Sequence, residues 1–171
     1  MKDLWNDNIK IHLQHLMPVI SSIIFILLFY IPAYPFVAEN IRPCIPYICI
    51  YFWLVNRPDI FGITYAFIIA FVADIASTSP AGTDIFALLI LYLTTTSIYK
   101  FVSNKPFNIV WFGFIIVSAL TLLAKWLIVS LYYSQFLAFS NVIFTFLSTI
   151  AFYPIFSVIN VYIHVYFMQE E

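Results

Sequence analysis

Long blocks of apolar residues are the feature that most restricts how this chain can fold. Two of them, residues 16–31 and 142–167, contain no Asp, Glu, Lys or Arg, and apolar blocks of about 18 residues or more are typical of membrane-spanning helices. The whole chain of 171 residues is 64% hydrophobic and 9% charged, with a mean hydropathy of +1.00, whereas soluble domains carry about 25% charged residues. The sequence therefore predicts an integral membrane protein.

The predicted spans are helices, because the apolar blocks lack the alternation of apolar and polar residues that marks a membrane β-barrel. We expect an all-α, polytopic membrane protein with about six transmembrane helices in a single domain over residues 1–171. The second block has only some 13 residues, fewer than the roughly 20 needed for a full crossing, so it is tilted, extended, or half-inserted and shielded by its neighbours. The six spans are expected at 16–31, 43–55, 60–75, 85–99, 107–131 and 142–167, with a loop near 132–141 and a kink at Pro154.

The distribution of Lys and Arg predicts the orientation of these spans. Six spans place both termini on one side of the membrane, and the terminal side carries five basic residues where the opposite side has only Arg42. By the positive-inside rule both termini are cytoplasmic. The first block resembles a signal peptide, but no A-x-A-like cleavage site follows it, so we interpret it as a retained first span. The five basic residues are Lys2, Lys10, Arg57, Lys100 and Lys105.

The third span carries small residues at a helical spacing. Gly62, Ala66, Ala70 and Asp74 follow one another at intervals of four, so they share one helix face. Small residues let two helix backbones approach closely within a membrane, and we expect this face to meet protein. A carboxylate inside the bilayer is costly, so Asp74 requires a partner, water or a shallow position.

A turn is expected after the third span, followed by the start of the next helix. Ser79-Pro80-Ala81-Gly82 fits a type I turn, with Ser at its first position, Pro at its second and Gly at its fourth. Thr83 or Asp84 would then cap the fourth span.

Several polar residues fall inside predicted spans. Lys125 lies far from both ends of the fifth span. Three arrangements remain open for it: an ion pair with Asp74, extension of its ammonium group to the membrane interface, or the lining of a polar cavity. Asn160 and His164 are separated by four residues in the last span. We expect these two residues, and the polar cluster at residues 94–97, to form hydrogen bonds with neighbouring helices. The alternative is that they line a path through the protein.

The sequence contains no recognisable catalytic motif. A phosphate-binding glycine loop, HExxH and G-x-S-x-G are missing, and no pair of acids in the spans suits catalysis. Cys44 and Cys49 match neither a redox pair nor a zinc site, and His12 and His15 have no third ligand. No basic run suits nucleic acid. We therefore expect a non-enzymatic interaction protein of the lipid bilayer that uses no metal and no cofactor.

Residues 42–93 resemble the core of the MreD family, bacterial inner-membrane proteins that determine rod shape. The resemblance consists of Arg42-Pro43, Arg57-Pro58, a helix with Gly/Ala spacing that ends in Ala73-Asp74-Ile75, and Pro80-Ala81-Gly82. The family usually has a glycine where this chain has Ala70 and a larger residue where it has Ala81.

The resemblance implies a subunit of the cell-elongation machinery that builds peptidoglycan and maintains cell shape from the inner membrane. Such a protein partners MreC, alongside the elongation-specific penicillin-binding transpeptidase, RodA and, indirectly, MreB filaments. The resemblance gives helix packing and partner docking as the roles of Arg57, Pro58, Asp74 and Gly82.

Two other functions remain open at the level of the sequence. The family fold is similar to the substrate-binding subunits of energy-coupling-factor transporters, which makes a vitamin-type solute-binding subunit the alternative. A transporter of lipid-linked precursors is a third hypothesis, which rests on Asp74 and Lys125 alone.

Overall fold

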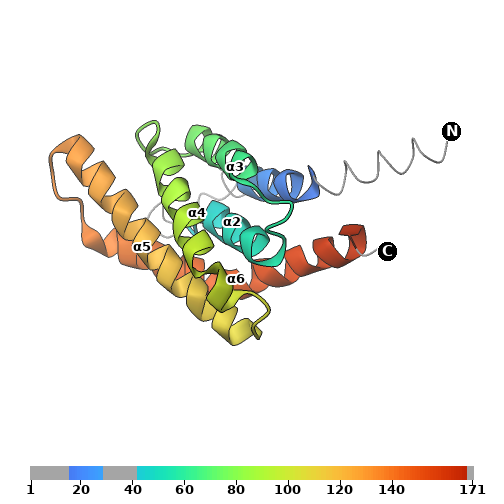
Figure 1. Ribbon diagram of the computed structural model, residues 1–171. Helices are drawn as coiled ribbons and strands as arrows, with labels where there is room; N and C mark the ends of the chain where they lie inside the picture. The colour runs from blue at the N-terminus through green and yellow to red at the C-terminus, as the bar shows by residue number, and fades with distance from the viewer. Residues whose placement is uncertain (1–15, 29–41, 169–171) are drawn as a thin grey trace.

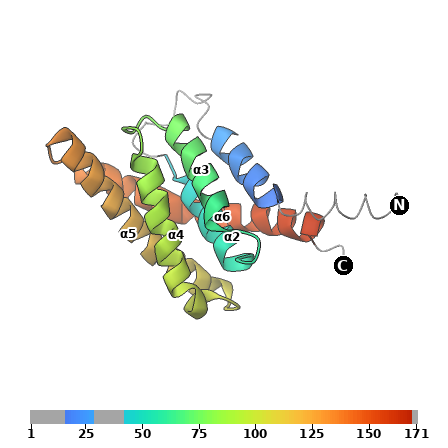
Figure 2. The same cartoon turned by 45° about the horizontal axis from the view of Figure 1, so that its top comes forward.

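The computed structural model describes residues 16–28 and 42–168. Within these ranges the chain forms six helices and no strand, arranged as one bundle (Figures 1 and 2). A helix at Leu16–Leu28 precedes α2 (Ile45–Asn56), α3 (Ile63–Ala76), α4 (Thr83–Val102), α5 (Phe107–Tyr133) and α6 (Phe139–Met168).

The helices lie where the apolar blocks predicted them, and their ends differ by a few residues. Residues 29–31 of the first expected span lie outside the described residues. The third helix begins at Ile63 instead of residue 60, because the N–H groups of Ile60 and Phe61 both bond to the carbonyl of Arg57 and close a turn there. The last helix begins at Phe139, so the loop expected near 132–141 is shorter than predicted.

Helix α2 is the centre of the bundle, and all of its residues from Ile45 to Val55 are buried. It lies against α3, α4, α5 and α6, and in both views it is drawn between α3, α4 and α6 (Figures 1 and 2). A helix that is apolar on every side is stable only when protein or lipid surrounds it. Its neighbours in the chain supply that enclosure.

The lengths of the helices fall into two groups. By length and composition, α4, α5 and α6 could each cross a membrane, and the other three are shorter apolar helices. The 12 residues of α2 span only about 18 Å, against a hydrocarbon core of about 30 Å. The finding confirms an all-helical, membrane-compatible protein but leaves six complete crossings unconfirmed.

A close contact joins α2 to α5. The Tyr51 hydroxyl donates a hydrogen bond of 2.8 Å to the carbonyl of Val110, one turn into α5. A Cβ atom added to Gly113 would lie 2.6 Å from the same hydroxyl oxygen, so glycine is what permits this approach. The Tyr51 ring also packs on Phe114 and Tyr153, which brings α6 into the same aromatic cluster.

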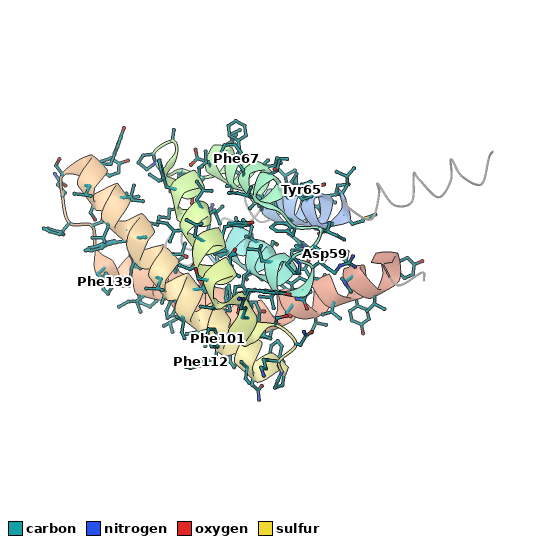
Figure 3. The ribbon with its side chains drawn as sticks, viewed as in Figure 1. Asp59, Tyr65, Phe67, Phe101, Phe112 and Phe139 are labelled. Carbon is teal, nitrogen blue, oxygen red and sulfur yellow. The ribbon has the colours of Figure 1, made fainter. Side chains whose placement is uncertain are left out.

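Large apolar side chains cover the outside of the bundle. Phe67, Phe101, Phe112 and Phe139 lie on the outside of α3, α4, α5 and α6, respectively (Figure 3). A surface of this kind suits lipid better than water. It agrees with the membrane environment that the composition predicts.

Candidate functional site

The carboxylate of Asp74, near the end of α3, binds the start of α4. Its Oδ2 accepts a hydrogen bond of 2.8 Å from the backbone N–H of Gly82, and its Oδ1 accepts one of 3.0 Å from that of Asp84. The first N–H groups of a helix lack partners within that helix, and the positive end of the helix dipole favours an anion there. Asp74 therefore caps α4 from the preceding helix.

This cap changes the turn that the sequence predicted. A type I turn over Ser79–Gly82 would direct the Gly82 N–H to the carbonyl of Ser79, but that N–H donates to Asp74 instead. The turn is shifted by one residue, since the Thr83 N–H closes it on the carbonyl of Pro80 at 3.1 Å. Gly82 has φ 90° and ψ −15°, the values of the third position of a type II turn, where glycine is favoured. The expected type I turn is therefore wrong.

Lys125 pairs with Asp84, not with Asp74. The Lys125 Nζ lies 2.5 Å from Asp84 Oδ1, with the lysine side chain 20% exposed and the aspartate side chain 5% exposed. The other carboxylate oxygen of Asp84 is buried without a hydrogen-bond partner. Breaking a buried ion pair leaves an uncompensated charge and is strongly destabilising, so this contact joins α4 to α5 firmly.

We call Asp74, Gly82, Asp84 and Lys125 the polar cluster. It links three helices in series: α3 caps α4 through Asp74, and α4 binds α5 through Asp84. The cluster therefore joins α3, α4 and α5. A separate hydrogen bond joins α2 to α6, since the N–H of Cys44 donates to Thr149 Oγ1 at 3.0 Å.

The small face of α3 is filled by the chain itself. Ala66, Ala70 and Ala73 are each only 1% exposed, and α3 packs on α4 and α2. Gly62 differs, because a Cβ atom there would meet nothing within 4 Å; it is the N-cap of α3 and not a point of close packing. The alanines therefore serve packing inside the protein, and this face is not free for a second protein.

Arg57 and Pro58 form the turn between α2 and α3. The Arg57 guanidinium pairs with Asp59 at 3.2 Å, with side chains 28% and 61% exposed. Slight burial of Asp59 acts to raise the pKa of its carboxyl group. Hydrogen bonds from Arg57 and from the backbone outweigh this effect and hold the pKa of Asp59 below its ordinary value. Pro58 is exposed, and it suits the second position of a turn because its φ is already fixed.

The remaining polar residues that the sequence placed inside predicted spans bond mainly within their own helices. The hydroxyls of residues 94–97 donate to carbonyls one turn earlier in α4. These hydrogen bonds lie within α4, whereas we expected them from the sequence to join α4 to other helices. The Asn160 amide donates to the carbonyl of Phe156 at 2.9 Å. His164 lies beside the Trp53 ring of α2, with 6.3 Å between ring centroids.

Asp84, Tyr51 and Gly113 are important contact residues that the sequence did not assign to these roles. Asp84 was expected only as a possible cap. Its position in the first turn of the fourth span, on the same side of the membrane as Lys125 in the predicted topology, is the clue that could have identified it. For Tyr51 and Gly113 no comparable pattern exists, because their contact joins residues far apart in the chain.

The site offers no arrangement suited to metal binding. Within the part of the chain that the structure describes, no three His, Cys, Asp or Glu side chains group so that they could hold a metal ion. The charged groups of the polar cluster are engaged by backbone N–H groups and by each other. This arrangement suits joining helices.

Comparison with known proteins gives one family. A family model described as the rod shape-determining protein MreD matches residues 9–162 of the 171 residues. No curated protein and no solved structure matches the chain significantly.

Proposed function

Since the chain belongs to the MreD family of rod shape-determining proteins, we propose that it is a membrane scaffold of the bacterial cell-elongation complex. In this role it holds MreC in the membrane and, through MreC, the transpeptidase and RodA, with MreB filaments linked indirectly. The observation that carries the proposal is the family match over residues 9–162. The family is a shape-determining structural family and not a known enzyme family, which supports a role without catalysis.

The structure supports a scaffold through the way it uses its polar groups. Asp74 and Lys125 are the residues on which the transport hypothesis rests, and both of them join helices, Asp74 as a cap of α4 and Lys125 through Asp84. A preorganised bundle of this kind loses little conformational entropy when a partner helix binds. Because Ala66 and Ala70 are buried within the chain, the partner contacts a different surface.

We further propose that the protein crosses the bacterial inner membrane six times with both termini in the cytoplasm. Three helices have the length and composition to cross, and the distribution of Lys and Arg favours cytoplasmic termini. Burial of α2 on all sides supports a short second crossing shielded by its neighbours. We propose as well that the fold is similar to that of the substrate-binding subunits of energy-coupling-factor transporters.

Co-purification from membranes with tagged MreC tests the scaffold. We expect a stable complex after gentle detergent extraction, and we expect cells depleted of the protein to become round. As a matched pair of variants, Lys125→Asp should reduce recovery of the complex because it breaks the bundle, whereas Lys105→Asp in the exposed α4–α5 loop should not.

Two results would contradict this function. One is a folded protein that neither binds MreC nor affects cell shape. The other is a vitamin-like molecule that stays bound through purification and is detected by native mass spectrometry, since that result would favour a solute-binding subunit.

A further inference from the structure

Three polar atoms on α2 and α6 are buried without hydrogen-bond partners. They are the indole Nε1 of Trp53, the amide Oδ1 of Asn160 and the imidazole Nε2 of His164. Trp53 and Asn160 are both 0% exposed. We call these three side chains the buried polar triad.

The packing of the two helices brings Trp53 and His164 side by side. Helices α2 and α6 run in the same direction, because Cys44 at the start of α2 bonds to Thr149 and Trp53 near its end lies beside His164, 15 residues further along α6. Asn160 precedes His164 by four residues and so lies one turn away on the same face. The contact therefore places two side chains of α6 along the face that meets Trp53.

The chemistry of the triad is complementary. An indole N–H can only donate a hydrogen bond, an amide oxygen can only accept one, and an imidazole nitrogen does either according to its tautomer. A buried polar group left without a partner destabilises the fold, and ordered water commonly satisfies such groups, with about two to four polar partners for each molecule. The Trp53 indole N–H supplies a donor and the Asn160 amide oxygen supplies an acceptor, which are the two kinds of partner that a bound water molecule needs.

We propose that the buried polar triad is an internal hydration site, in which one or two water molecules bridge the Trp53 indole to Asn160 and His164. Water enters from the end of the bundle at the Arg57–Asp59 turn, because the Arg57 N–H bonds to the carbonyl of Trp53 and the Asp59 side chain is 61% exposed.

Nuclear magnetic resonance of the full-length protein in detergent micelles tests the site directly. The chain has four tryptophans, and a Trp53→Phe variant identifies the Trp53 indole N–H signal. We expect a cross-relaxation peak between this proton and water. A Trp53 indole proton with no water cross-peak, or with one to a bound organic molecule, would overturn the proposal, and this measurement needs no variant of Asn160.

Substitution of Asn160 gives a second test, which is read from the water signal. Asn160→Leu should remove the water cross-peak of the Trp53 indole N–H, because the amide oxygen that holds the water is lost. The readout is the cross-peak and not the thermal midpoint, because this change also removes the hydrogen bond from the Asn160 amide to the carbonyl of Phe156. A cross-peak that persists in Asn160→Leu would contradict the bridge. Asn141→Leu, at an exposed position near the start of α6, is the matched control.

A double-mutant cycle completes the experiment. Two side chains that share a water are coupled, so the combined Trp53→Phe and Asn160→Leu variant should lose less stability than the sum of the two single variants. Strict additivity would show that the two groups share no bridging molecule.

Discussion

At the residue scale, Asp74 shows how a carboxylate is accommodated in an apolar helix. It lies near the C-terminal end of α3, where the helix dipole disfavours a negative charge, and it is stabilised by the N-terminus of α4. The two hydrogen bonds from backbone N–H groups replace the water that the carboxylate would otherwise bind. The residue therefore has an architectural role in the described structure.

Replacement of Asp74 should weaken the start of α4. We expect Asp74→Ala to cost about 1 to 2 kcal/mol, the usual effect of removing a helix cap, and Asp74→Asn to cost less because its amide oxygen still accepts one N–H bond. Thermal unfolding in detergent measures both. Asp59→Ala, which removes an exposed carboxylate from a surface ion pair, is the control with little effect, and equal losses at both positions would contradict the capping role.

The pairing of Lys125 predicts a specific rescue. Lys125→Asp and Asp84→Lys should each cost about 3 kcal/mol, because each places like charges together in a buried setting. The double exchange should recover most of the loss in folded yield and thermal midpoint. Lys125→Asp combined with Asp74→Lys should recover neither the folded yield nor the thermal midpoint. Rescue by that combination would show that Lys125 pairs with Asp74 and not with Asp84.

The contact at Gly113 predicts a clash that a second substitution relieves. In Gly113→Ala the new methyl group lies 2.6 Å from the Tyr51 hydroxyl oxygen, and overpacking of this kind costs about 1 to 3 kcal/mol. Adding Tyr51→Phe removes the oxygen, so the double variant should be more stable than Gly113→Ala alone. The unfolding midpoints of the two variants check this prediction. A double variant with a lower midpoint than Gly113→Ala alone would refute the contact.

At the scale of the element, α2 differs from α3 in what surrounds it. Every residue of α2 from Ile45 to Val55 is buried, whereas α3 buries its alanine face and exposes Ile63, Phe67, Phe71 and Ile75. The difference follows from position in the bundle, because α2 packs on four labelled helices while α3 packs on two.

Lipid contact distinguishes the two helices experimentally. Brominated lipids quench tryptophan fluorescence on contact, so a variant that keeps only Trp53 should be quenched weakly. A variant with all four native tryptophans replaced by Phe and carrying Phe71→Trp on the exposed face of α3 should be quenched strongly. Comparable quenching of the two would mean that α2 faces lipid.

At the scale of the whole molecule, the connections of the bundle define two ends. The α3–α4 turn and the α5–α6 loop belong to one end, and the α2–α3 turn and the α4–α5 loop belong to the other. The polar cluster lies at the first end and the Arg57–Asp59 pair at the second. In the proposed topology the first end faces away from the cytoplasm.

Cysteine labelling in intact cells tests this orientation. In a background with Cys44 and Cys49 replaced by Ala, a membrane-impermeant thiol reagent should react with Ser79→Cys and Gln135→Cys from outside. Asp59→Cys and Lys105→Cys should react only after the cells are made permeable. The reverse pattern would invert the proposed topology.

The sequence by itself determined the class of the protein and the approximate positions of its helices. Apolar blocks that water cannot solvate must form helices that satisfy their own backbone groups, and this requirement depends on local composition alone. The motif residues from Arg42 to Gly82 likewise indicated the family that the comparison confirms. The burial of Ala66 and Ala70 follows from the same periodicity, since small residues on one face favour close packing.

Only the tertiary structure decided which polar residues meet. Lys125 could have paired with Asp74 or Asp84, which are ten residues apart on either side of one turn, and the choice depended on where that turn directs each carboxylate. The contact of Tyr51 with Val110, and the burial of the whole of α2, depend on helices far apart in the chain. Such contacts are set by how helices pack against one another, and no local pattern of residues encodes that packing.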